Sequence, residues 1–151
     1  MDFIQQEIRT IIQSNSSLNA KLLQICEFLD KSFEYYNWTG FYFKNGDKNE
    51  LKLGPYVGAH TDHVIIPFGK GICGQVALSN ETFLVDDVYE QENYLACSID
   101  TKSEIVVPIF KNGENVGQID IDSHTVNAFS DKDQQLLEFI CTEIGKLLEK
   151  S

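Results

Sequence analysis

The sequence predicts an α+β fold in which a mostly antiparallel sheet carries the N- and C-terminal helices on one face. Two observations support this class: both ends of the chain show helical periodicity, and the middle alternates with a period of two. A third is an Asn-Gly pair between two strand-like segments, which is typical of a tight hairpin. With 151 residues the chain is expected to form one domain, residues 1–151, whose core needs no metal or disulfide.

Three segments have apolar residues at helical spacing. They start near residues 4, 18 and 131, and the third opens with Ser130-Asp131-Lys132-Asp133, a capping-box-like start. Their apolar positions are Ile4, Ile8, Ile11 and Ile12; then Leu18, Leu22, Cys26, Leu29 and Phe33 up to about residue 36; and finally Leu137, Cys141, Ile144 and Leu148. Cys26 and Cys141 lie on these stripes, so we expect both to be core-packing thiols.

Between the helices, alternating apolar residues predict strands at residues 38–44, 50–58, 63–68 and 82–88. Residues 103–122 then predict a hairpin that turns at Asn112-Gly113.

Residues 69–74 read G-K-G-I-C-G and match the G-x-G-x-x-G pattern of dinucleotide-binding loops. A dinucleotide site also needs a full crossover helix and a second parallel strand. Only about two helical turns fit between Ile72 and Ser79, and a hairpin follows instead. We therefore expect no nucleotide site here.

Composition excludes several classes of partner. Asp and Glu number 23 against 12 Lys and Arg, which gives a net charge of −11, so neither nucleic acid nor an anionic membrane is an expected partner. The N-terminus lacks signal-peptide features, and no apolar run is long enough to span a bilayer. The four cysteines are then expected to be thiols of a cytosolic protein.

Two cysteines lie outside the helical stripes. Cys73 sits among glycines at the expected start of a short helix, just after Lys70, and both features favour a thiolate. Cys97 lies in a polar stretch, where we expect it to be accessible. This pair favours thiol chemistry over incidental packing. His60 and His63 lie nearby, but there is no C-x-x-C pair and the spacings are irregular, so we expect no metal site.

An acidic group is expected at the open end of the hairpin. Asp120 and Asp122 point to the same face as Gln118, and folding back about the turn brings Glu104 opposite one or other of the two aspartates. Such close carboxylates repel unless water or a cation intervenes. A solvated edge and an ammonium socket both fit this spacing. Cys97, seven residues before Glu104, favours the socket and a small amino-acid-like substrate.

Several blocks of the sequence resemble one enzyme family. They are WTGFYF, LGPYVG, IPFGKGICG, VDDV, ACSIDTKSEIVVPIF, VGQIDIDS and FSDKDQQLLE. From about residue 38 to the C-terminal helix, the chain resembles the free methionine-(R)-sulfoxide reductases, which are single-domain enzymes of the GAF fold. The resemblance implies thiol-dependent reduction of free L-methionine (R)-S-oxide to methionine.

The resemblance also implies the catalytic groups. The nucleophile would be Cys97, which attacks the sulfoxide sulfur and becomes a sulfenic acid while protonated Glu104 assists departure of the oxygen. Cys73 would be the redox partner that condenses with Cys97 to a disulfide, which a thioredoxin-like reductant reopens. Neither an organic cofactor nor a metal is implied, and a homodimer would fit the family.

The same resemblance implies the substrate-binding groups. Glu104, Asp120 and Asp122 would hold the amino group, while Trp38 and Tyr42 would line the pocket for the methyl sulfoxide.

Two departures from the family pattern bear on the function. His63 stands where three-cysteine members carry a further cysteine, and residues 93–98 read NYLACS instead of GHIACD. The alternative interpretation is a non-catalytic GAF module that senses a small ligand. The missing cysteine favours the sensor, whereas the two thiols outside the helical stripes and the absence of an output domain disfavour it.

Overall fold

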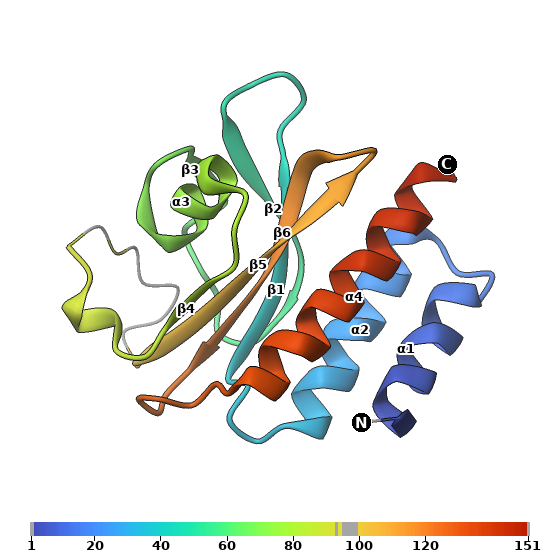
Figure 1. Cartoon of the computed structure of the whole chain (residues 1–151), viewed down its shortest axis with the longest axis horizontal. Helices are drawn as coiled ribbons and strands as arrows, with labels where there is room; N and C mark the ends of the chain where they lie inside the picture. Colours follow the sequence, from blue (N-terminus) through green and yellow to red (C-terminus); the bar gives the residue numbers. More distant parts are fainter. Residues whose placement is uncertain (1, 93, 95–99, 151) are drawn as a thin grey trace.

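The architecture follows the order of elements that the periodicity predicts. A computed structural model describes residues 2–92, 94 and 100–150 (Figure 1). The elements are α1 (Asp2–Gln13), α2 (Leu18–Ser32), β1 (Trp38–Lys44), β2 (Glu50–Val57), β3 (Ile65–Pro67), α3 (Gly71–Ser79), β4 (Phe83–Val85), the 3₁₀ turn η1 (Val88–Glu90), β5 (Ser103–Lys111), β6 (Glu114–Ser123) and α4 (Asp131–Glu149).

Six antiparallel strands form one sheet in the order β3-β2-β1-β6-β5-β4. The predicted hairpin is confirmed as β5–β6. Its turn residues Asn112 and Gly113 have φ angles of 52° and 80°, the left-handed conformation that an Asn-Gly turn requires. An irregularity in pairing between Ile109 and Phe110 sets the register, so that Glu104 lies opposite Asp122.

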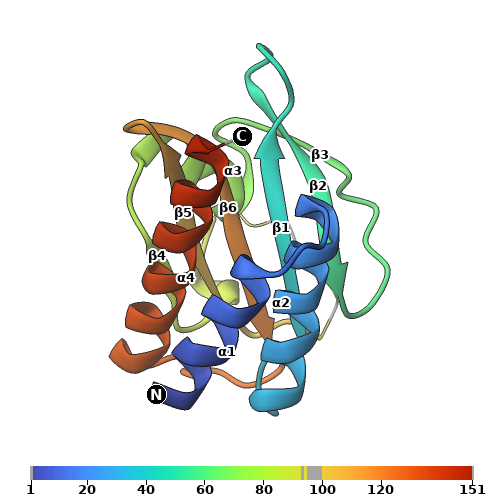
Figure 2. The same cartoon turned by 90° about the vertical axis from the view of Figure 1, so that its right-hand side faces the viewer.

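Three helices cover one face of the sheet, which confirms the α+β class. In Figures 1 and 2, α2 and α4 lie against the sheet and α1 lies outside them. The core between these helices and the sheet consists of their apolar stripes and the inward side chains of β1, β5 and β6, including Ile8, Leu22, Ile25, Leu29, Phe41, Ile105, Val107, Ile119, Ile121, Leu137, Ile140 and Ile144. Among the described residues, no helix is both long and apolar enough to cross a bilayer.

Some predicted boundaries are wrong because local contacts end the elements early. α2 stops at Ser32 rather than near residue 36, since Phe33 takes an extended conformation and its ring stacks on Tyr36 at 4.5 Å between centroids. β4 ends at Val85, because the Asp87 side chain accepts a hydrogen bond from Tyr89 N and begins the 3₁₀ turn. At the opposite edge of the sheet, β3 has three residues, Ile65–Pro67, instead of the predicted residues 63–68.

The opposite face of the sheet carries α3 and a smaller apolar core. The nine-residue α3 leads to β4, which pairs antiparallel with β5, so the chain does not make the parallel crossover of a dinucleotide fold. The glycines of the G-x-G-x-x-G pattern allow close packing of α3 instead of binding a nucleotide. Gly71 has a φ of 62°, and a Cβ on Gly74 would lie 2.7 Å from Pro67 O. α3 therefore approaches the chain more closely than any other residue at position 74 would permit.

A buried carboxylate joins the start of α4 to the segment after α2. One oxygen of Asp133 accepts from the hydroxyls of Tyr35 at 2.7 Å and Tyr36 at 2.6 Å. The other accepts from Ser130 N and Ser130 Oγ at 2.9 and 3.1 Å, which completes the predicted capping box. Burial, together with hydrogen bonds to Asp133, raises the pKa of both tyrosines, so they remain donors. This network closes the end of the helical layer.

We predict that Asp133→Ala lowers the free energy of unfolding by about 3 kcal/mol, because it leaves the buried Tyr36 hydroxyl and the Ser130 amide without an acceptor. Urea unfolding measures the change. Asp131→Ala, which removes an exposed acid from the same helical turn, is the control and should change stability by less than about 0.5 kcal/mol. Equal losses in the two variants would contradict a role for the network.

Candidate active site

Strand pairing brings the predicted site residues onto the face that carries α3. Across β1 and β6, Trp38 lies opposite Asp122 and Tyr42 lies opposite Gln118. Residues opposite each other in neighbouring strands project to the same face. The intervening Ile119 and Ile121 pack in the helix-side core, which confirms the predicted alternation along β6.

The three carboxylates lie together and are buried. Glu104, Asp120 and Asp122 expose 2%, 0% and 1% of their surface, so the solvated edge that the spacing left open is excluded. Burial raises the pKa of Glu104 well above the ordinary value of a glutamate, and the charges of Asp120 and Asp122 and hydrogen bonds to both raise it further. Glu104 therefore holds a proton that it shares with the aspartates.

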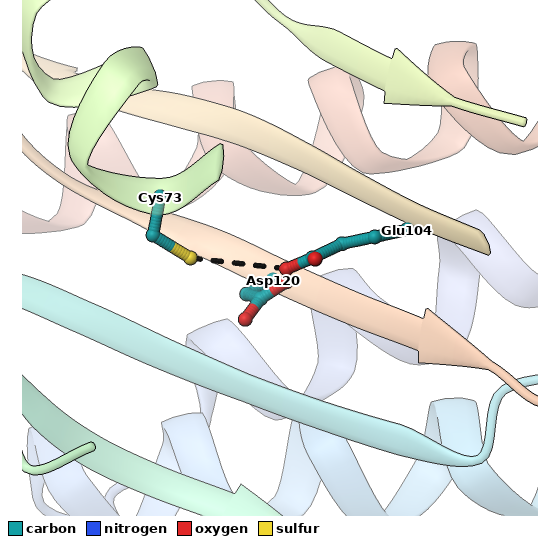
Figure 3. Close-up of side chains that lie close together, drawn as sticks. All are labelled: Cys73, Glu104 and Asp120. Carbon is teal, nitrogen blue, oxygen red and sulfur yellow. Dashed lines mark hydrogen bonds between the residues drawn. The ribbon is translucent and has the colours of Figure 1, made fainter. Parts of the chain in front are cut away.

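Cys73, on the helix α3 that covers this face of the sheet, contacts the buried carboxyl groups. It is the third residue of α3, is 5% exposed, and its Sγ donates to Glu104 Oε2 at 3.9 Å (Figure 3). The predicted place of Cys73 at the start of a short helix is confirmed. The residue lies in a helix, its sulfur faces carboxyl groups, and Lys70 is an exposed residue at the N-cap. The close packing of Gly74 explains this, because it presses the first turn of α3 onto the sheet.

Gln118 was not predicted as a site residue. Its side chain is fully buried, and its Nε2 donates to Cys73 O at 3.1 Å, so it ties β6 to the first turn of α3. Its Oε1 is also buried and has no hydrogen-bond partner among the described residues. Its position two residues before Asp120, on the same face of the strand, could have identified it as a site residue from the sequence.

An aromatic wall stands beside the acids. Trp38 and Tyr42 are 1% and 0% exposed, and their ring centroids are 6.4 Å apart. The indole donates to Ala59 O at 3.0 Å and the Tyr42 hydroxyl to His63 O at 2.9 Å. A Cβ on Gly40 would lie 2.5 Å from the indole, which explains the glycine in the W-x-G block.

The remaining cysteines divide into two groups. Cys26 and Cys141 are buried free thiols on the helical side of the sheet, which confirms their predicted place in the core. Burial raises the pKa of both thiols, which makes them poor nucleophiles. Cys97, the predicted nucleophile, lies outside the described residues.

The acids, the thiol and the aromatic wall are all closed to solvent. A surface cavity of about 840 Å³ lies between β5 and α4, and one of about 650 Å³ lies between α2 and β2. Neither is lined by a predicted site residue. Because no predicted site residue that the structure describes exposes more than 5% of its surface, a ligand can reach the acids only if a covering segment moves.

The buried carboxyl groups determine what this site can bind and donate. Three buried carboxyl groups can receive a cation, and the protonated one can donate a proton. His60, considered above as a metal ligand, is instead exposed and contacts Asp62 at 3.1 Å. The groups that converge on one point are Cys73 Sγ and carboxylate oxygens of Glu104 and Asp120, which lie within 4.8 Å of one another.

Known proteins are similar to this chain in sequence and fold. The sequence profile of the GAF domain matches residues 17–149. A free methionine-R-sulfoxide reductase of Saccharomyces cerevisiae is 43% identical over 117 residues, which are 76% of this chain and 62% of the relative. The Escherichia coli protein of the same name is 30% identical over 145 residues, or 96% of this chain and 86% of the relative.

Among solved structures, the free methionine-R-sulfoxide reductase of Neisseria meningitidis in complex with its substrate superposes with a TM-score of 0.91. It is 32% identical, and the match covers 97% of this chain and 86% of the other. The chain therefore belongs to the GAF-domain family and, within it, to the family of free methionine-R-sulfoxide reductases.

Proposed function

We propose that this protein reduces free L-methionine (R)-S-oxide to methionine, with Cys97 as the nucleophile and a thioredoxin-like protein as the electron donor. The observation that carries the proposal is the buried cluster of Glu104, Asp120 and Asp122 beneath Cys73. The relatives named as free methionine-R-sulfoxide reductases support the choice of substrate.

The acids recognise the free amino group of the substrate. A buried carboxylate is stable only when it is protonated or paired with a cation. The ammonium group of a free amino acid supplies that cation and three donors for Glu104, Asp120 and Asp122. Trp38 and Tyr42, on the same face of the sheet, receive the apolar methyl end. Methionine sulfoxide within a peptide has no ammonium group and would leave the acids unpaired.

The chemistry transfers one oxygen atom to sulfur. The Cys97 thiolate attacks the sulfoxide sulfur, Glu104 donates its proton to the sulfoxide oxygen, and methionine leaves as Cys97 becomes a sulfenic acid. Cys73 then attacks Cys97, which forms a disulfide and releases the oxygen as water. A thioredoxin-like dithiol reduces this disulfide and returns both thiols.

The proposed resolving role of Cys73 rests on its position in the substrate site. Its sulfur is 3.9 Å from the proton-sharing Glu104, whereas Cys26 and Cys141 lie beyond the sheet in the helical core. His63 cannot form a disulfide in place of the family's further cysteine. The cytosol is the proposed compartment, because Cys26 and Cys141 are free thiols.

The second candidate function is a sensor that binds a free amino acid without turning it over. The presence of His63 at the position of a family cysteine favours it. The burial of Cys73 against Glu104 weighs against it, because simple binding of an ammonium group needs no thiol among the acids.

Turnover of free and N-acetylated substrate tests the proposed function. We expect reduction of free methionine (R)-sulfoxide with a dithiol reductant. The kcat/KM on the N-acetylated compound should be lower by about 100-fold or more, because acetylation removes the charge that the acids require. The (S)-sulfoxide of free methionine is the control for stereochemistry. Similar rates on free and acetylated substrate would show that the acids do not hold the amino group.

The cysteine roles are tested by variants and disulfide mapping. Cys97→Ser should abolish turnover, whereas Cys26→Ala should retain it because Cys26 lies in the helical core. After one equivalent of substrate, peptide mapping of the wild type should show a Cys73–Cys97 disulfide that is absent in Cys73→Ser. The resolving role is wrong if Cys73→Ser turns over normally with the same reductant.

Glu104→Gln should separate stability from activity. Above about pH 4.5, the ordinary pKa of a glutamate, the unfolded chain has lost the Glu104 proton while the folded protein retains it. The wild type therefore loses stability as pH rises, until the raised folded-state pKa is passed. Glutamine does not titrate, so the variant should gain stability relative to the wild type over this range. Its turnover should fall by about 100-fold, because the proton donor is lost.

Urea unfolding at several pH values between 5 and 8 measures the difference in unfolding free energy between Glu104→Gln and the wild type. These values lie above the ordinary pKa of a glutamate, where the raised pKa of Glu104 affects stability. Glu114→Gln, on the exposed end of the same hairpin, is the matched control and should leave the pH profile of stability unchanged. A Glu104→Gln profile parallel to that of the wild type would refute the buried proton.

A further inference from the structure

We propose that Cys73, Glu104 and Asp120 form a binding site for a thiophilic divalent cation such as Zn²⁺, and that this metal excludes the substrate's amino group. The second clause rests on the proposed function, whereas the metal site itself does not.

The three ligand atoms already converge. Cys73 Sγ and one carboxylate oxygen each from Glu104 and Asp120 lie within 4.8 Å of one another, and Sγ is 3.9 Å from Glu104 Oε2. Figure 3 shows the three side chains pointing toward one another from α3, β5 and β6. Bonds of ~2.3 Å from zinc to sulfur and ~2.1 Å to oxygen place tetrahedral ligand atoms roughly 3.5 Å apart. The ligand atoms therefore need to approach one another by about 1.3 Å or less to complete the geometry.

Rigid elements hold these ligands in place. Glu104 and Asp120 lie on the adjacent strands β5 and β6 in the interior of the sheet. Cys73 is fixed by the close approach of Gly74 to Pro67 O and by the hydrogen bond from Gln118 to its carbonyl. Preorganised ligands lower the cost of ordering a site on binding.

An independent observation comes from Gln118. Its Oε1 is fully buried, lies on the same face of β6 as Asp120, and has no hydrogen-bond donor among the described residues. Because Nε2 is committed to Cys73 O, the amide orientation is set and the oxygen remains an acceptor. A water molecule on the metal would donate to this oxygen and complete a four-coordinate site.

The ligand set also selects the metal. A thiolate with two carboxylates suits zinc and the chemically similar cobalt and cadmium, while magnesium and calcium prefer oxygen ligands alone. On binding, the protons of Cys73 and Glu104 leave to solvent, and the thiolate and the carboxylate become ligands. The metal then offsets part of the buried negative charge, as the proposed ammonium group would.

Cobalt titration of the reduced full-length protein tests the site. Co²⁺ should produce a thiolate-to-cobalt charge-transfer band, and Zn²⁺ should erase that band by displacement. Cys73→Ser should lose the band, and Asp120→Asn should weaken cobalt binding by about tenfold or more. Cys97→Ser and Cys26→Ala are the matched controls and should keep it. Near-UV circular dichroism confirms that each variant is folded.

Two outcomes would overturn the metal site. One is the absence of a charge-transfer band in the folded wild type at millimolar cobalt. The other is a band that survives in Cys73→Ser but disappears in Cys97→Ser, which would place the metal elsewhere.

Competition tests the overlap with the substrate. Free L-methionine should raise the apparent Kd for cobalt more than glycine does. Both amino acids chelate cobalt in solution through their amino and carboxylate groups, so glycine controls for chelation. Only methionine also contacts Trp38 and Tyr42. Equal effects of the two amino acids would refute the overlap. A protein that binds cobalt in this way but never reduces methionine sulfoxide would refute the proposed function alone.

Discussion

The burial of three carboxyl groups on one face of the sheet is the constraint on which the site depends. Like charges in a low-dielectric interior are unfavourable, and here Glu104 relieves the repulsion by keeping its proton and sharing it with Asp120 and Asp122. The group stays buried because α3 packs closely over it, through glycines that let its first turn approach the chain. The cluster can therefore receive a cation, which is the basis of the proposed binding of an ammonium group.

The sheet divides the cysteines by environment. Cys141 and Cys26 lie behind it among apolar side chains, where burial raises the pKa of each thiol. Cys73 lies in front of it against a carboxyl group that holds a proton. The same residue type thus packs among apolar side chains on one face and lies beside a carboxyl group on the other. The helical layer, closed at one end by Asp133 and its tyrosines, supports this division by covering the rear of the sheet.

Much of this arrangement could be predicted from local patterns. Two-residue alternation places Asp120 and Asp122 on one face, and the Asn-Gly turn brings Glu104 opposite them to within one position. The one-residue ambiguity could not be resolved, because the irregularity near Ile109 depends on packing of the whole hairpin. Gln118 was missed as a site residue for a similar reason, since its contact with Cys73 joins segments 45 positions apart.

The sequence by itself determined the α+β class, the hairpin, the core thiols and the set of residues that the family resemblance implies. Periodicity and turn chemistry are local properties, and they are readable from neighbouring residues. Only the tertiary structure decided that the acids are buried rather than solvated, and that the Cys73 thiol donates to Glu104. Burial and electrostatic environment depend on what packs over a residue from distant parts of the chain, here α3 over β5 and β6.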